Sequence, residues 1–290
     1  MAKNKKTNKN NATQKNNTPY YTPQPYNISK PTSSNKEIID SLHAVYPNIF
    51  DKVQFGKFGN DRSGEYEPGK PMRLDSNTYE IPNQLPDSYF KEGSKGRLSR
   101  DMFLSTAKHE GQHKIDNFAM NVNNQDLNKK LDLVDQDAMN SHIAYMNSNQ
   151  PKAYDLKQYY RLSIDDPYKS VGGGSFYFNP TEQRSYMNNI YSRKPEKDYL
   201  TNEGYKKLYY DNDEYDLSDF EHAITSPEEM EAKKQRLEDA YKTADKLMGK
   251  NKDKKYYKNR IEDVGDSIAD KRRDKIKSIP GFYNKMPWQK

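Results

Sequence analysis

Apolar residues recur at helical spacing in several separate stretches of the chain. In residues 36–50, Ile38, Ile39, Leu42 and Val45 predict a short amphipathic helix that Pro47 ends. A longer helix is predicted from Ser99, a plausible N-cap, to about residue 120. Its predicted buried face consists of Met102, Phe103, Leu104, Ala107, Ile115 and Phe118.

Further periodic stretches predict more helix than strand. Residues 126–146 carry Leu127, Leu131, Val134 and Ala138 at helical spacing. Pro151 is placed to start another helix, and Asn179 followed by Pro180 predicts the cap and first residue of a third. Short strands are expected within residues 77–85 and at 175–178, and the rest of 51–97 is expected to be loop.

The C-terminal segment predicts two charged helices. Ser226 and Glu229 form a capping box, and Gly249 is placed to end the helix that follows. One face of that helix holds Met230, Leu237, Tyr241, Ala244 and Met248. A second helix, with Ile261, Val264 and Ile268, runs towards Pro280, and we expect the two to form a helical hairpin.

Charge divides the chain into three parts. Residues 1–36 contain seven lysines and no acidic residue, whereas residues 37–226 contain 23 basic and 30 acidic residues. The first part is nearly free of aliphatic residues, so we expect it to be disordered. The predicted organisation is a basic tail (1–36), a folded domain (37–225) and a hairpin extension (226–290). Nucleic acid is expected to bind weakly at most, through the tail.

Composition restricts the chemistry that the chain can perform. There is no cysteine among the 290 residues, so disulfides and thiolate chemistry are excluded and any metal must use His, Asp or Glu. No stretch approaches the apolar length of a membrane span, and no apolar segment follows the positive N-terminus as in a signal peptide. We therefore expect a soluble protein of a reducing compartment, or one exported by a route that the sequence does not show.

Two of the five histidines lie together in the predicted helix that starts near Ser99. His109 and His113 are four residues apart, which places them on one helical face with Cβ atoms about 6 Å apart. Two imidazoles at this spacing can bind one Zn²⁺. Glu110 is rotated by about 100° from His109, so it can reach a metal-bound water and act as a general base. The alternative is a polar helix face without a metal.

The motif His109-Glu110-Gly111-Gln112-His113 resembles that of the zincin-type metallopeptidases. The resemblance implies that both histidines bind zinc, that Glu110 is the general base, and that a glutamate downstream is the third ligand. Glu182, after the Asn-Pro helix start, is the candidate, although it could instead belong to a capping box over Asn179. Where related enzymes often have aspartate four residues later, this chain has Tyr186.

Other residues considered for the site are weaker candidates. His142 could fold back towards the motif, but we interpret it as a partly buried histidine at a helix–helix contact, and His43 and His222 as structural. Tyr177, Tyr186 or Tyr191 could polarise a substrate carbonyl. The three consecutive glycines at 172–174 lack the lysine of a phosphate loop and indicate a flexible rim or turn.

The sequence therefore predicts an α+β, predominantly helical protein with a zincin-like core and few strands. The first hypothesis is a zinc-dependent peptidase acting on a protein or peptide substrate. The second is a structural protein that keeps the zincin-like fold without activity, because the basic tail, the charged hairpin and the Asn/Lys/Tyr-rich composition are similar in style to neck, tail and ring proteins of phage virions. In that case the tail and the hairpin would contact other virion proteins. The two hypotheses combine in a peptidase carried in a virion, and this resemblance implies a location in the bacterial cytoplasm or in a virion.

Overall fold

The computed structural model describes residues 35–56, 63–75, 85–150, 156–157, 160–161, 178–211, 217–252 and 262–281. The expected disorder of residues 1–34, the strands expected at 77–85 and 175–178 and the helix expected from Pro151 lie wholly or largely outside these residues. The fold is mostly helical with few strands, as the sequence predicts. None of the described helices has the length and apolarity needed to cross a membrane.

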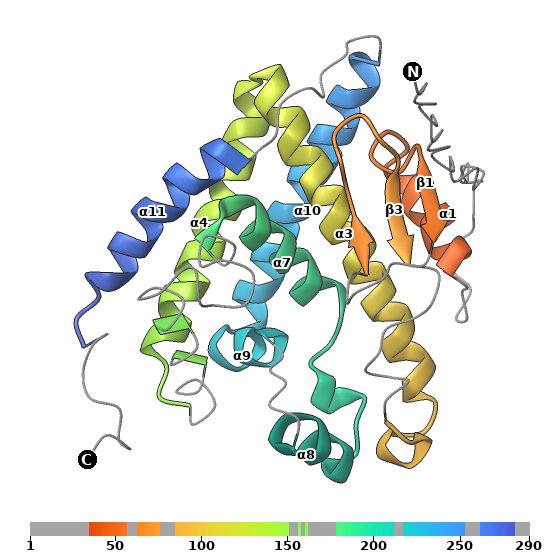
Figure 1. Ribbon diagram of the computed structural model, residues 1–290, viewed down its shortest axis with the longest axis vertical. Coiled ribbons are helices and arrows are strands. Elements are labelled where there is room, and N and C mark those ends of the chain that lie inside the picture. The colour runs from red at the N-terminus through yellow and green to blue at the C-terminus, as the bar shows by residue number, and fades with distance from the viewer. Residues whose placement is uncertain are drawn as a thin grey trace, which may run out of the picture.

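The elements follow one another in the order shown in Figure 1. The strands are β1 (Val53–Gly56), β2 (Gly64–Glu65) and β3 (Met72–Asp75). The α-helices are α1 (Asn35–Val45), α3 (Ser94–Val122), α4 (Gln125–Asn147), α7 (Pro180–Ser192), α8 (Asn202–Asp211), α9 (Leu217–Ile224), α10 (Pro227–Lys250) and α11 (Glu262–Lys277). Two short 3₁₀ helices, η1 (Asp87–Tyr89) and η2 (Glu196–Asp198), complete the list.

A small mixed sheet occupies the region that was predicted to be mainly loop, so that prediction is wrong. The strand order is β1-β3-β2, with β1 parallel and β2 antiparallel to β3. Val53 pairs with Met72, and both side chains are buried, whereas the edge strand β2 has only two residues. The sheet lies on one side of α3, and α4, α7 and α11 lie on the other (Figure 1).

Helix α3 is longer than the sequence predicts. It begins at Ser94 after Gly93, which has the left-handed backbone conformation at φ 65°, so Ser99 lies inside the helix and not at its cap. The hydroxyl of Ser99 donates to the carbonyl of Lys95 one turn earlier. The other end is closed by Asn123, also left-handed at φ 47°. The helix thus passes through the whole domain and carries the histidine pair in its interior.

The two C-terminal helices are not the paired extension that the sequence predicts. Helix α10 contributes Leu237, Ala240 and Tyr241 to the main hydrophobic core, where it packs on α3 and α4. Helix α11 instead packs on α7 (Figure 1). The Ser226 cap is confirmed, because its hydroxyl accepts from the amide of Glu229. Helix α10 continues through Gly249 to Lys250, one residue past the predicted end.

Candidate metal centre

The histidine-bearing turn of α3 is held by close packing behind it. A Cβ atom at Gly111 would lie 3.0 Å from the hydroxyl of Tyr241 and 3.1 Å from the Phe50 ring. The same hydroxyl donates to the carbonyl of Lys108, the residue before His109. The glycine therefore serves a packing purpose, as its presence inside a helix suggested. This packing fixes the face of α3 opposite the histidines against the core.

Helix α7 brings Glu182 to the two histidines. Asn179 caps the helix by accepting hydrogen bonds from the amide and the hydroxyl of Thr181, each at 2.9 Å, and Pro180 follows as its first residue. The cap is therefore made without the Glu182 side chain. That carboxylate instead lies between the imidazoles, with Oε2 at 3.5 Å from His109 Nε2 and Oε1 at 3.5 Å from His113 Nε2. Helices α3 and α7 pack along each other, which sets this approach.

The geometry of the three side chains fits one tetrahedral metal ion. One ligand atom from each of His109, His113 and Glu182 lies within 4.8 Å of the other two. Ligands about 2.0–2.1 Å from a tetrahedral ion lie about 3.3 Å apart, close to the nitrogen–oxygen separations found here. In addition, Glu182 Oε2 is buried without a hydrogen bond of good geometry. Two imidazoles and one carboxylate form a donor set typical of a catalytic zinc site.

The pKa values of the three candidate ligands are shifted in different directions. Burial alone would lower the pKa of His109, but its polar contact with Glu182 and the charges of Glu110 and Glu182 outweigh burial and raise the pKa. Burial lowers the pKa of His113 to about 4, so this ring is neutral at pH 7. Burial would raise the pKa of Glu182, but the polar contact with His109 and the charges of both histidines lower it. Of the two histidines, His109 thus holds a proton more strongly than His113.

The edge strand β2 covers the side chain of Glu110, which lies in α3. This side chain is 7% exposed and lies against Gly64, where a Cβ atom would be 2.8 Å from Glu110 Cγ. The backbone amide of Tyr66 donates a hydrogen bond to the carboxylate. Burial nevertheless raises the pKa of Glu110 to about 7, a shift that His109 opposes and Glu182 reinforces. A carboxylate with this pKa can exchange a proton at neutral pH.

Two residues of α7 other than the ligand surround His109. The Tyr186 ring packs edge-on against the imidazole, with ring centroids 5.5 Å apart. The interaction with the Asn189 side chain raises the pKa of His109, and the buried atoms His109 Nδ1 and Asn189 Oδ1 lack any well-aligned partner. Asn189 lies seven residues after Glu182, whereas the position four residues after Glu182, where the resemblance suggested an aspartate, is Tyr186. The helical spacing of Asn189 from Glu182 was the signal that could have identified Asn189.

A buried polar network behind the candidate ligands connects the helices that carry them. Asp116 of α3 accepts from Gln112 at 3.0 Å and from Arg184 of α7 at 3.1 Å. Arg184 also donates to Asp135 of α4, which in turn accepts from Arg272 of α11. Arg184 lies two residues from Glu182, so these ion pairs fix the turn of α7 that presents the third candidate ligand. None of these residues was identified from the sequence.

The other residues considered from the sequence lie apart from the three candidate ligands. His142 is buried between α4 and α7, where its Nδ1 lies 3.0 Å from Gln183 Nε2, which confirms its interpretation as a histidine at a helix–helix contact. His43 contacts the carbonyl of Phe50, and His222 lies on α9. The Tyr191 hydroxyl contacts Met187 Sδ and not the ligands. Tyr177 and residues 172–174 lie outside the described residues.

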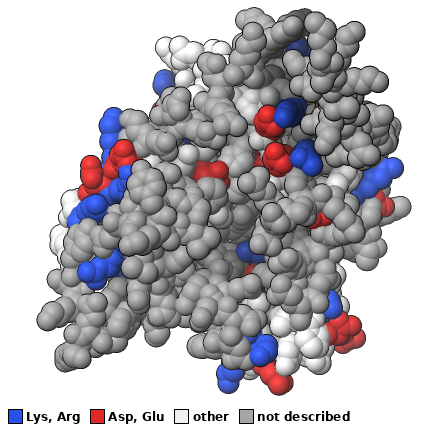
Figure 2. Space-filling model, in the orientation of Figure 1, with Lys and Arg blue, Asp and Glu red and all other residues white. Residues whose placement is uncertain are grey.

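Comparison of the chain with protein-family models, curated proteins and solved structures gives no match. The functional assignment therefore depends on the geometry of the residues themselves. On the face shown in Figure 2, described lysine and arginine side chains lie beside aspartate and glutamate. A basic surface of the kind that binds nucleic acid is not seen among the described residues of that face.

Proposed function

We propose that this protein is a zinc-dependent peptidase with a zincin-like core. One observation carries the proposal: each histidine Nε2 lies 3.5 Å from a different oxygen of Glu182, beside a buried glutamate whose pKa is about 7. His109, His113 and Glu182 would hold the metal. Glu110 is not one of the three residues grouped by ligand-atom distance, which suits a base better than a fourth ligand.

The chain's own groups supply the proton transfers of peptide hydrolysis. Zinc at this site would provide a Lewis acid that polarises the scissile carbonyl and lowers the pKa of a water molecule. Glu110 accepts a proton from the attacking water and can return it to the leaving nitrogen, since its pKa near 7 allows both transfers at neutral pH. The amide of Tyr66 holds the carboxylate in place for both steps.

The position of β2 favours an extended peptide as the substrate. This strand pairs with β3 on one side, and within the described residues no strand pairs with its other side. It also lies directly against Glu110. An extended peptide could add to such an edge through backbone hydrogen bonds, which would place its peptide bonds next to the catalytic groups. This arrangement supports a peptide substrate over a small molecule.

Replacing Glu110 by glutamine tests the proposal. The amide cannot take up the proton of water, so turnover of a mixed peptide library should fall by about 10²-fold or more while zinc is retained. Glu203→Gln, at an exposed position on α8, is the control and should keep both activity and zinc. A wild-type protein that is fully loaded with zinc and cleaves no member of the library would instead support the structural role.

A further inference from the structure

Helix α11 packs on the domain through a face that contains a buried charge. Ala269 and Ile276 of this face are fully buried in one hydrophobic cluster with Phe178, which lies just before α7. Arg272 lies between them at helical spacing and is 4% exposed. An apolar residue would suit the packing alone, because burying a guanidinium group costs free energy that its partners have to offset. The partners of Arg272 therefore indicate which part of the fold this charge fixes.

Arg272 holds the turn of α7 that carries Glu182. Its Nη1 donates to Gln183 Oε1 at 2.7 Å and to the carbonyl of Phe178 at 3.5 Å. Along the chain, these two residues lie on either side of the helix cap and Glu182. The amide nitrogen of Gln183 donates to Nδ1 of His142 in α4, at 3.0 Å. The Gln183 side chain is thus held at both ends of its amide, which restricts the backbone next to Glu182.

The other end of the guanidinium group joins α11 to the ion pairs behind the candidate ligands. Nη2 of Arg272 donates to Asp135 of α4, which also accepts from Arg184 of α7 at 3.2 Å. Arg184 in turn pairs with Asp116 of α3, the helix that carries both histidines of the site. The four charges alternate in sign, so each lies beside an opposite charge. This pairing connects α11 to both helices that carry the candidate ligands.

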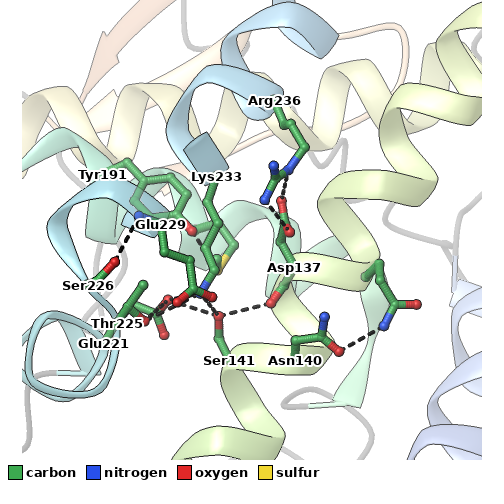
Figure 3. Close-up of polar contacts among 12 residues, drawn as sticks. Asp137, Asn140, Ser141, Tyr191, Glu221, Thr225, Ser226, Glu229, Lys233 and Arg236 are labelled. Carbon is green, nitrogen blue, oxygen red and sulfur yellow. Dashed lines mark hydrogen bonds and ion pairs between the residues drawn. The ribbon is translucent and has the colours of Figure 1, made fainter. Parts of the chain in front are cut away.

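Helix α10 is joined to its neighbours by ion pairs of its own (Figure 3). Lys233 pairs with Glu221 of α9 at 2.9 Å, and Arg236 donates to both oxygens of Asp137 in α4, at 2.6 and 2.7 Å. Asp137 lies two residues after Asp135 in α4, but the hydrogen bonds of Arg236 end on Asp137 and do not reach the first turn of α7. Arg236 is therefore a control for the loss of an ion pair between helices.

We propose that Arg272 is a positioning residue of the metal centre, through which the packing of α11 raises the zinc affinity of the site. The proposal rests on the proposed function, because it takes His109, His113 and Glu182 as the ligands. Arg272 acts through Gln183, the neighbour of Glu182, and its own hydrogen bonds do not reach the three candidate ligands. Replacing residues that orient metal ligands typically changes metal affinity by about 10–100-fold.

Zinc affinity of the full chain, measured by chelator competition, tests this role. Arg272→Met keeps a long apolar side chain on the buried face but removes the donors, and it should weaken zinc binding about tenfold or more. Arg236→Met should leave zinc affinity unchanged. With Co²⁺ in place of zinc, the visible absorption spectrum should change in Arg272→Met and not in Arg236→Met, because the spectrum reports coordination geometry. The loss in an Arg272→Met, Gln183→Met double variant should be smaller than the sum of the two single losses, since both act on the same turn.

Amide hydrogen exchange of the wild-type protein is a second measurement, which needs no variant to fold. Coupling between two sites is reciprocal, so zinc should strengthen the packing of α11 by the factor by which that packing raises zinc affinity. Exchange of the α11 amides should therefore slow about tenfold or more with zinc, and more than exchange in α8, which packs on η1 and η2. Equal slowing in both helices, or unchanged zinc affinity in a folded Arg272→Met protein, would overturn the proposal. A wild-type protein that binds no zinc would overturn the proposed metal centre as well.

Discussion

A single methyl group added at Gly64 tests whether the edge strand fixes the proposed general base. Gly64 lies in β2, directly over Glu110, and its φ is not in the left-handed region, so alanine is compatible with the backbone there. The added Cβ would lie 2.8 Å from Glu110 Cγ, 2.9 Å from Glu110 Oε1 and 2.8 Å from Thr106 Cγ2. Gly64→Ala therefore displaces Glu110 without changing any catalytic or ligand side chain.

The expected change in the free energy of unfolding follows from these distances. Carbon atoms pack best at about 3.5–4.0 Å, and Thr106 is β-branched and cannot rotate away freely. Overpacking of this kind costs about 1–3 kcal/mol, against which alanine gains about 0.4–1 kcal/mol by restricting the unfolded chain. We expect a net loss of about 0.5–2 kcal/mol in unfolding free energy. Gly56→Ala is the matched control, because no atom of the described residues lies within 4 Å of its added Cβ.

Urea unfolding, zinc content and peptide turnover of both variants are the measurements. Gly56→Ala should be about 0.4–1 kcal/mol more stable than wild type, with unchanged turnover. Gly64→Ala should be less stable and slower but keep its zinc, because none of its close contacts is to a proposed ligand. If Gly64→Ala is as stable and as active as Gly56→Ala, the strand does not constrain Glu110 and the reasoning is wrong.

Three further results are expected. Gly111→Ala should not stabilise the protein, because its Cβ would meet buried groups 3.0–3.3 Å away. Gly96→Ala in the same helix meets no atom of the described residues within 4 Å and should add up to about 1 kcal/mol to the free energy of unfolding in urea. The pKa of His109 is raised and that of His113 is about 4, so only His109 takes up a proton first as the pH falls. Zinc affinity, measured by chelator competition, should therefore fall about tenfold per pH unit below the His109 pKa. A hundredfold fall per pH unit would show that both rings are protonated together. Glu182→Gln should weaken zinc binding about a hundredfold or more in the same assay; unchanged affinity would remove it from the ligand set.

Those parts of the site that depend on local spacing could be predicted from the sequence. His109 and His113 share a face because they lie one turn apart in a helix whose apolar positions are periodic. Asn179 and Pro180 identify the start of α7 because capping chemistry is also local. The contact between Glu182 and the histidines could be proposed only from the resemblance. The sequence separation of α3 and α7 does not fix how these two helices pack.

The remaining features depend on contacts between distant segments. Strands β1 and β3 are four residues each, and their parallel pairing joins Val53 to Met72 without a local signal. The enclosure of Glu110 arises from β2, which has only two residues, so no periodic pattern could reveal it. The charged sequence of α10 suggested an outer helix, yet its apolar positions, Tyr241 among them, are buried in the core and its Lys233 is covered through pairing with Glu221.

The zinc content of the purified protein is the most direct test of the proposed metal centre. Metal analysis after dialysis against zinc-free buffer should give about one Zn²⁺ per chain for wild type and none for the His109→Ala, His113→Ala double variant. X-ray absorption of the wild-type protein should show nitrogen and oxygen ligands at about 2.0–2.2 Å. A double variant that retains stoichiometric zinc, or a folded wild-type protein that cannot bind zinc, would contradict the assignment of His109, His113 and Glu182 as the metal centre.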